Sequence, residues 1–400
     1  MSEFLHGVEI IELDNGTRPI KTVKSSVIGL VGTAPKGPVN VPILIMGSKK
    51  DAVETFGPIT EGFTIPQALD AIFNQTGAMV VVINVADPEY HVNEENELDP
   101  SLVTMGDVVG GVGSNGQNTG VQALLSAQTE VKVKPRLLIA PGFTHERPEG
   151  NANPVIAALN SVADTLKAIV IADCPNSNDK DVIAHRSDWG TPRLFEIYPW
   201  VKVYDKKIDT VTEVPASAHV AGLIAKSDNE RGFWWSPSNM IINGIVGISK
   251  PIDFVLGEGN CKANYWNSQQ ITTIIQEDGY RLWGNRTTSS DPKWSFLSVR
   301  RTADMINDSI LRAHMWAIDR NITKTYIEDV CEGVRAYLRQ LQSEGAILGG
   351  DCWVDSSINT AENIKDGKVV FDFDFTPPYP AEHVTFRSSL VDNYITEIFK

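Results

Sequence analysis

The stretch Gly111-Val-Gly-Ser-Asn-Gly116 has the GxGxxG spacing of a dinucleotide-binding turn. Such a turn binds a pyrophosphate only where it joins a strand to a helix, because the helix N-terminus supplies the N–H groups that hold the anion. Here residues 102–109 have a helical pattern, and the residues after Gln117 are irregular. The stretch is therefore interpreted as a flexible glycine loop, and no cofactor is expected.

Two carboxylates, Asp372 and Asp374, lie two residues apart in Phe371-Asp-Phe-Asp-Phe375. Strict alternation of this kind predicts a strand, so the two acids share one face and could tune each other's pKa for acid-base chemistry. The opposite face is aromatic, however. The favoured interpretation is a strand with a packed apolar face whose acids face solvent or a basic partner.

Other catalytic and metal-binding motifs are missing from the sequence. The seven histidines form no HExxH motif, and the four cysteines, which are interpreted as reduced core thiols, have no CxxC spacing. Residues 32–37 lack the GK[ST] ending of a P-loop, and residues 236–239 lack the GxSxG turn of a serine hydrolase. We therefore expect a structural protein with no metal, although an α/β enzyme with a substrate pocket at Phe233–Trp235 stays open as a rival hypothesis.

Composition limits the possible partners and the compartment. The chain has 400 residues, 42% of them hydrophobic, and a formal net charge of -15. Such a length favours two or three packed units, and the acidic balance with scattered cations excludes a phosphate-binding surface, so no nucleic acid is expected as a partner. The start lacks the basic and apolar pattern of a signal peptide, and no apolar run is long enough to cross a bilayer, so neither export nor membrane insertion is expected.

The order of apolar runs predicts an α/β fold. Short buried runs at 27–31, 41–45, 79–85, 136–140 and 168–172 alternate with helical patterns such as 65–73 and 154–167. Residues 87–134 interrupt this order and are interpreted as an excursion or small subdomain. Two further helices, 302–318 and one after Asn321, predict a second domain.

Both ends of the chain carry segments that lie outside this pattern. Gly7–Asp14 is strand-like and ends at the turn signal Asn15-Gly16, and residues 381–400 alternate through Val384, Phe386 and Leu390. Terminal strands with unpaired edges can pair with another chain. We therefore expect arms at about 1–24 and 381–400.

Several long strings resemble the tail sheath proteins of contractile-tailed phages of the myovirus type and of R-type pyocins. The similarity extends nearly end to end, and residues 87–134 match least. The strings are Ala140–His145, Gly232–Asn239, Asp278–Arg286, Phe296–Ile306 and Phe371–His383.

The resemblance implies a multi-domain α/β fold with mixed sheets, flanking helices and extended terminal strand arms. Its parts would be an N-terminal arm at 1–24, an α/β sheath domain at 25–260, a tube-proximal α/β domain at 261–380 and a C-terminal arm at 381–400. The arms would add strands to a sheet in neighbouring subunits, and the strand with Phe371 to Phe375 is the candidate receiving sheet. The expected arm and mesh residues are Val8, Ile10, Leu13, Phe371, Phe373, Phe375, Val384, Phe386 and Leu390.

The implied function is mechanical. Subunits would polymerise helically around a tail tube and contract, which drives the tube through the host cell envelope without a nucleotide. Implied partners are other copies of the chain, the tube protein, and the baseplate and tail terminator proteins, in the virion tail and, during assembly, in the host cytoplasm. Arg320 and Lys324 are candidate tube contacts, although an ordinary solvated helix face explains them equally well. The sheath of a related injection or secretion machine is the alternative within this class.

Overall fold

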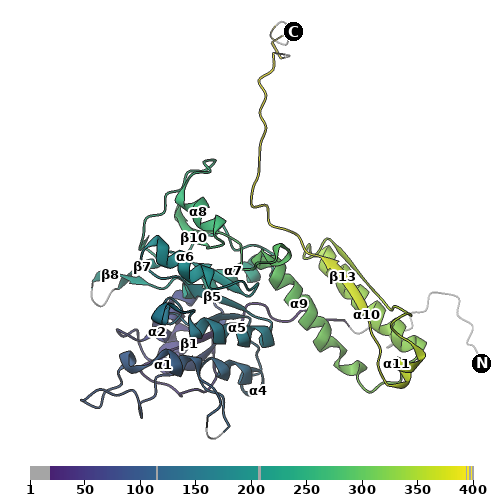
Figure 1. Ribbon diagram of the computed structural model, residues 1–400, viewed down its shortest axis with the longest axis horizontal. Coiled ribbons are helices and arrows are strands. Elements are labelled where there is room, and N and C mark those ends of the chain that lie inside the picture. The colour runs from purple at the N-terminus through teal and green to yellow at the C-terminus, as the bar shows by residue number, and fades with distance from the viewer. Residues whose placement is uncertain (1–18, 114–115, 206–208, 393, 396–397, 399–400) are drawn as a thin grey trace, which may run out of the picture.

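The computed structural model describes residues 19–400 except 114–115, 206–208, 393, 396–397 and 399–400. Figure 1 shows a large α/β body, a smaller C-terminal unit beside it, and an extended tail that leaves the rest of the molecule. The predicted α/β class with several sheets and flanking helices is confirmed.

The body is built on a six-stranded sheet with the strand order β2-β3-β1-β4-β5-β6. All neighbouring strands in it are parallel except the edge strand β2, which runs antiparallel to β3. The parallel strands are continuous apolar runs because helices and loops cover both faces of the sheet. The strands are β1 (Ile28–Gly32), β2 (Ile43–Met46), β3 (Met79–Asn84), β4 (Leu137–Ile139), β5 (Ile169–Asp173) and β6 (Leu194–Ile197).

Helices on the two faces of this sheet enclose two hydrophobic cores. One core contains the apolar sides of α2 (Thr64–Phe73) and α7 (Ser217–Arg231), and the other contains that of α5 (Pro154–Leu166). α5 begins where the sequence predicts, because the Asn153 side chain accepts hydrogen bonds from two first-turn N–H groups and proline fits the first helical position. Two further helices of the sheet region are α1 (Lys49–Phe56) and α6 (Asp179–Ser187).

Residues 87–134 pack on the α5 face of the sheet. This segment contains α3 (Met105–Val109) and α4 (Ala127–Glu130), and it buries Val108, Val121 and Leu124 in the same core as α5. The GxGxxG stretch at 111–116, whose residues 114–115 lie outside the described residues, follows α3. It therefore follows a helix, whereas a dinucleotide-binding turn follows a strand.

Two small antiparallel sheets extend the body beyond β6. Figure 1 shows these small sheets and α8 in the upper left part of the body. They are β8-β7-β9, made of β7 (Val201–Asp205), β8 (Thr210–Val214) and β9 (Gly247–Ile248), and the pair β10 (Thr273–Gln276) and β11 (Tyr280–Trp283), with α8 (Lys262–Ser268) alongside.

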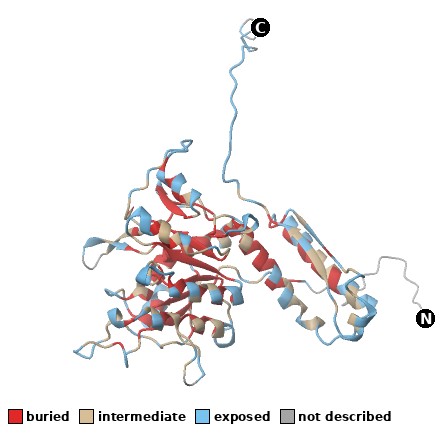
Figure 2. Ribbon diagram, viewed as in Figure 1, coloured by how far each residue is buried: buried red, intermediate tan, exposed pale blue. Residues whose placement is uncertain are grey.

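The C-terminal unit packs two long helices against a two-stranded sheet. It contains α9 (Leu297–Ala313), α10 (Lys324–Ser343), α11 (Ala361–Lys365), β12 (Gly349–Trp353) and β13 (Asp372–Thr376). The apolar stripe predicted for α10 is confirmed: Val334, Tyr337 and Leu341 are buried and Ile327 is partly buried in one core, and Val330 is buried as well. Figure 2 shows burial running through the sheet and α9, whereas the tail is exposed throughout.

Buried ion pairs attach α9 to the body. The Asp308 carboxylate of α9 accepts a hydrogen bond from Lys134 Nζ at 2.9 Å and pairs with the buried Arg136 guanidinium, and Asp304 pairs with Arg193 Nη1 at 2.6 Å. Burial alone would raise the pKa of Asp308, but the hydrogen bonds and charges of Lys134 and Arg136 outweigh it and hold that pKa below its ordinary value. α9 is therefore fixed to the body by charge pairs that water does not screen.

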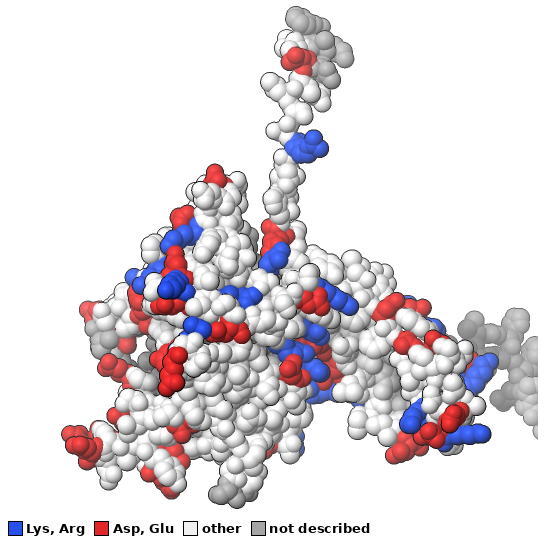
Figure 3. All heavy atoms as spheres, in the orientation of Figure 1, with Lys and Arg blue, Asp and Glu red and all other residues white. Residues whose placement is uncertain are grey.

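Charged side chains of both signs are interspersed on the face drawn in Figure 3, and much of that surface is uncharged. Within the described residues, no helix has the length and apolar character needed to cross a bilayer.

A buried histidine in α7 makes the fold sensitive to acid. His219 is 2% exposed, and burial lowers its pKa to about 4, while Asp70 acts weakly in the opposite direction. The unfolded chain then binds a proton that the folded chain excludes, so stability is lost as the pH falls from about 6.5 through 4, by up to about 3 kcal/mol. We expect His219→Gln to remove this part of the pH dependence in denaturant melts at several pH values. The exposed His383→Gln is the control, and an unchanged pH profile in the His219 variant would contradict the assignment.

Candidate assembly interface

The C-terminal unit carries a two-stranded antiparallel sheet with open edges. β12 pairs with β13 in the register Gly349↔Thr376 to Trp353↔Asp372. Within the described part of the chain, each strand has a neighbour on one side only. Backbone N–H and C=O groups on the two outer edges are therefore positioned to accept added strands.

The three aromatic residues predicted for the receiving strand lie in and beside β13. Phe373 and Phe375 belong to the strand and Phe371 directly precedes it, and all three are partly buried against the core that α9 and α10 share. Cys352 of β12, paired with Phe373, is fully buried there, and burial beside Cys331 raises its pKa to about 12. One face of the small sheet is thus fixed by packing within the chain.

The other face of the sheet is acidic. Asp374 is directly opposite Asp351, and its Oδ1 accepts a hydrogen bond from the Asp351 backbone N–H at 2.9 Å. Arg335 of α10 donates to Asp351 Oδ1 at 2.8 Å. The backbone N–H of Cys352 and the Arg335 guanidinium hold the pKa of Asp351 below its usual range.

The C-terminal tail leaves the molecule immediately after an ion pair. The Arg286 guanidinium binds both Glu382 oxygens, at 2.8 and 2.6 Å, and this hydrogen bonding raises the pKa of Arg286. Every residue from Ala381 to Asp392 is exposed, and Val384, Phe386 and Leu390 are 62%, 92% and 101% exposed. These three residues have the same parity, so they would share one face of an extended strand.

Most of the predicted N-terminal arm lies outside the described residues. Val8, Ile10 and Leu13 lie in 1–18, of which the structure describes nothing. The segment that follows is fixed to its own chain: Ile20 is buried in the C-terminal core, and the backbone N–H of Val23 donates to Ser309 Oγ of α9 at 3.1 Å.

The two candidate tube contacts lie together at the turn between α9 and α10. Arg320 is exposed, with its guanidinium 5.4 Å from the centre of the Trp316 ring. Lys324 opens α10, is 89% exposed and lies 3.7 Å from Glu328. Both cations are thus on the surface, at one end of the C-terminal unit.

A charge in place of Phe373 is expected to destabilise the C-terminal unit. Phe373→Asp puts a carboxylate among apolar groups of the core without a cationic partner in its place, which we expect to cost about 2–4 kcal/mol. Chemical denaturation followed by circular dichroism measures this, with the same substitution at the exposed Phe386 as the matched control. Equal midpoints for the two variants would show that Phe373 does not support the sheet.

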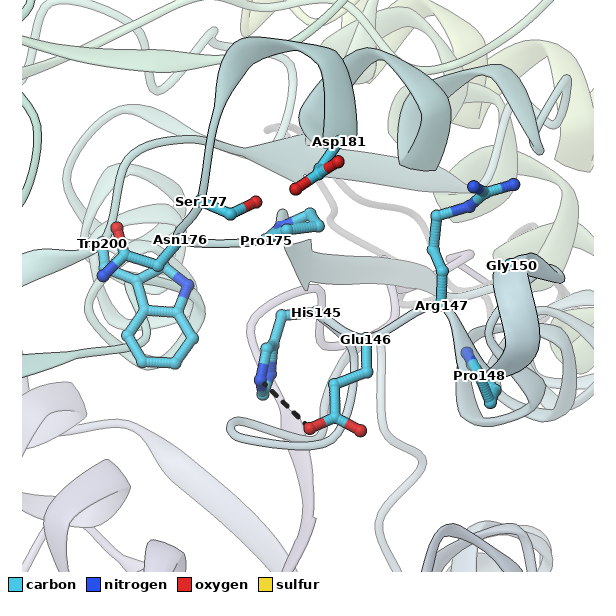
Figure 4. Close-up of a pocket in the computed structure, with 10 residues that line it drawn as sticks. All are labelled: His145, Glu146, Arg147, Pro148, Gly150, Pro175, Asn176, Ser177, Asp181 and Trp200. Atoms are coloured by element: carbon cyan, nitrogen blue, oxygen red, sulfur yellow. Dashed lines mark ion pairs between the residues drawn. The ribbon is translucent and has the colours of Figure 1, made fainter.

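A surface hollow near the parallel sheet does not assemble a catalytic constellation. Figure 4 shows the pocket of about 700 Å³, lined by His145, Glu146, Asp181 and Trp200 among others. His145 Nε2 is 3.7 Å from Glu146 Oε1, too far for a hydrogen bond, and burial lowers the pKa of His145. His145 Nδ1 is buried and has no hydrogen-bond partner among the described residues, so no hydroxyl or thiol nucleophile is paired with that nitrogen.

The rival enzyme hypothesis placed a substrate pocket at Phe233–Trp235. A pocket of about 980 Å³ does lie there, lined by Trp234 and Trp235 among others, whereas Phe233 is part of the C-terminal core, with Trp234 packed edge-on at 5.1 Å between ring centres. Trp235 is half exposed beneath the Arg231 guanidinium, which also donates to the Ser236 carbonyl at 3.0 Å. These residues therefore hold the junction between α7 and the C-terminal unit.

Two parts of this interface have no signal in the sequence. β12 was not predicted, because Gly349-Gly-Asp-Cys-Trp353 lacks the alternation that marks β13. The Arg286–Glu382 ion pair spans 96 residues, so only the fold brings it together. Arg286 does lie in one of the strings that carried the resemblance.

Three family models match consecutive parts of the chain. Residues 25–85 match the "tail sheath protein Gp18 domain III N-terminal region", residues 116–288 match the "phage tail sheath protein central domain", and residues 289–390 match the "phage tail sheath C-terminal domain". The third match covers α9, α10, both strands of the open-edged sheet and the start of the tail.

Curated relatives are similar over almost the full length. A putative prophage major tail sheath protein of Pseudomonas aeruginosa is 42% identical over 99% of this chain and 98% of its own. The tail sheath protein of Escherichia phage P2 is 35% identical over 100% and 98%. In fold, the chain is similar to the helical sheath of the anti-feeding prophage in its contracted state, with a TM-score of 0.70 and 22% identity over 97% of this chain and 99% of that one. The chain belongs to the phage tail sheath protein family.

Proposed function

We propose that this chain is the sheath subunit of a contractile tail, which polymerises helically around a tube and shortens to drive that tube through a cell envelope. The observation that carries the proposal is the exposed tail with apolar residues on one face, beside a two-stranded sheet with open edges. In the monomer Phe386 and Leu390 are exposed to water and contribute no hydrophobic stabilisation, whereas in the proposed polymer they are buried between subunits.

Strand addition supplies the connection between subunits. In this scheme the tail of one copy pairs with an outer edge of β12 or β13 in another copy, and backbone hydrogen bonds hold it. Val384, Phe386 and Leu390 then lie on one face of the enlarged sheet. Because a tail reaches a neighbour and not its own sheet, the contacts are heterologous and generate an open helix.

The N-terminal arm is proposed to act in the same way, through Val8, Ile10 and Leu13. The contacts of Ile20 and Val23 with the C-terminal unit support it, because they fix the base of the arm next to the sheet that would receive strands. The proposed division is an arm at 1–24, a sheath domain at 25–260 that includes the segment 87–134, a tube-proximal domain at 261–380 whose α8, β10 and β11 pack with the body, and an arm at 381–400. Contraction is then a change in packing between neighbouring subunits, while the arms keep them connected.

The remaining partners follow from a sheath function. We propose that the turn with Arg320 and Lys324 contacts the tail tube protein, that other subunits contact baseplate and terminator proteins, and that the chain has no enzymatic activity. It would assemble in the host cytoplasm and reside in the virion tail. The fold is also similar to the sheath of an extracellular contractile injection system, at a TM-score of 0.67 and 18% identity, which supports such a machine as the second candidate.

Negative-stain electron microscopy of the purified chain tests the proposal. Hollow helical tubes are expected from the full-length protein, and soluble monomers from versions that lack residues 1–20 or 384–400. Monomeric particles of the full-length protein at every salt and protein concentration would overturn the sheath assignment. Normal tubes from both truncated versions would overturn the arms alone.

A further inference from the structure

Three buried side chains that no role above explains converge behind the pocket of Figure 4. Cys174 directly follows β5, His185 lies on α6 and Glu196 lies in β6, and all three are 0% exposed. One ligand atom from each lies within 4.8 Å of the other two. Because Ala172 of β5 is the register partner of Glu196, Cys174, two residues further on, points to the same side of the sheet as Glu196.

The orientation of His185 is fixed by its outer nitrogen. Nε2 lies 2.8 Å from the Thr144 carbonyl oxygen, and a carbonyl only accepts, so Nε2 carries the proton. In the neutral ring Nδ1 then presents a lone pair to the cluster, 2.8 Å from Glu196 Oε1. Metal-bound histidines are held in this way, with the second ring N–H donated to a carbonyl or carboxylate.

Glu196 is a buried carboxylate with two basic side chains nearby. His185 Nδ1 lies 2.8 Å from its Oε1, and the nearest guanidinium nitrogen, Arg186 Nε, is 3.9 Å from Oε2. A fully buried carboxylate needs a compensating cation. Protonated His185 supplies one in the metal-free chain, and a metal ion that also binds the Cys174 sulfur would supply one in its place.

We propose that Cys174, His185 and Glu196 bind one Zn²⁺ ion. Thiolate, imidazole and carboxylate together form a donor set that suits zinc, and three protein ligands leave a fourth tetrahedral position open to water. The charges balance: the ion contributes two positive charges, the thiolate and the carboxylate contribute two negative ones, and the ring is neutral. The site is then neutral as a whole, as a fully buried position requires.

When Zn²⁺ binds, it replaces the proton on the Cys174 sulfur, and no group is oxidised or reduced. Burial beside Glu196 and Asp173 raises the pKa of the Cys174 thiol, so the metal-free chain keeps that proton. The ion displaces the proton, which leaves to solvent, and a sulfur–zinc bond replaces the sulfur–hydrogen bond. The pocket lies next to the cluster in the chain, because its lining residues His145 and Pro175 directly follow Thr144 and Cys174.

The sequence did not reveal this set because the ligands lie eleven residues apart on three separate elements. Spacing motifs detect ligands on one turn or one helix. Here the parallel register of β5 and β6 and the position of α6 bring the side chains together. A bound ion would connect these three elements and stabilise the edge of the six-stranded sheet.

Metal analysis of the intact full-length chain tests the proposal directly. The protein is refolded with Zn²⁺ or with a chelator, dialysed and measured by inductively coupled plasma mass spectrometry. We expect about one tightly held zinc ion per zinc-refolded chain. Refolding with Co²⁺ should give the thiolate-to-cobalt charge-transfer absorption of a cysteine-bound tetrahedral ion. Zinc content at the background of the chelator-treated sample, without a cobalt–thiolate band, would overturn the site and leave an ordinary His185–Glu196 ion pair.

Single variants identify the ligands. Cys174→Ser should abolish the charge-transfer band, and Cys261→Ser, a buried free cysteine on another element, should leave it unchanged. His145→Asn provides the matching histidine control beside the pocket. If Cys174→Ser does not fold, the wild-type measurements still decide. A cobalt band that persists in folded Cys174→Ser would place the metal elsewhere and overturn the assignment.

Discussion

Asp308→Ala is expected to lower the free energy of unfolding by about 3–5 kcal/mol, because it removes the shared counter-ion of Lys134, Arg136 and Arg312. Arg136 is 2% exposed and keeps only backbone carbonyl partners, at Leu166 and Lys167, once the carboxylate is gone. Lys134 loses its hydrogen bond as well. Urea denaturation monitored by tryptophan fluorescence measures the loss.

An exposed ion pair provides the control for this variant. Glu328→Ala removes the partner of Lys324, whose side chain is 89% exposed, and should change stability by less than about 0.5 kcal/mol. The pH dependence gives a second check. The pKa of Asp308 is lowered in the folded state, so its stabilisation is present above the unfolded pKa near 4 and is lost as the pH falls below it. An Asp308→Ala variant as stable as the parent would show that α9 does not depend on this network.

The network matters for a contractile subunit because α9 is the element that joins body and C-terminal unit. Its inner side carries Asp304 and Asp308 against Arg193 and Arg136 of the body, and its Met305 and Ile306 lie in the core shared with α10. A helix fixed on both sides transmits force as a rigid part. We infer that movement during contraction occurs between subunits and at the arms, while α9 keeps its place.

The elements that the sequence predicted are those whose burial sets a recognisable pattern of apolar residues. The parallel strands are continuous apolar runs because both of their faces are buried, and α10 has apolar residues at three-to-four spacing because one of its faces is buried. The short strand β12 and the antiparallel direction of β2 were not predicted. Strand pairing is a long-range property, and neither strand's own residues encode its partner or direction.

The candidate interface was predicted in part for the same reason. Phe371 to Phe375 alternate so regularly that the strand was evident, whereas its partner and its open edges required the fold. Exposure of Val384, Phe386 and Leu390 could not be derived from the sequence, since alternation predicts a strand but not whether its neighbour belongs to the same chain. A search for local motifs does not detect the cluster of Cys174, His185 and Glu196.

Paired substitution of Phe386 and Leu390 by aspartate is expected to abolish tube formation while leaving the monomer intact. Both side chains are more than nine-tenths exposed, so the charge has no folding cost in the monomer. In a polymer the same positions face the apolar side of an added strand, where each buried charge opposes assembly by several kcal/mol. Sedimentation and negative-stain microscopy measure polymer, and thermal melting measures the monomer.

The matched control puts the same charge on another exposed aromatic residue. Tyr90 is 76% exposed in the loop after β3, far along the chain from either arm. Tyr90→Asp should assemble like the parent. Because the paired tail variant adds two carboxylates and this control adds one, Tyr90→Asp is compared with the single variant Phe386→Asp, and a difference between these two locates the effect in the tail and not in net charge. Tubes of normal yield from the tail variant would mean that its apolar face is not buried between subunits, and the connection would then have to come from backbone pairing or from the N-terminal arm.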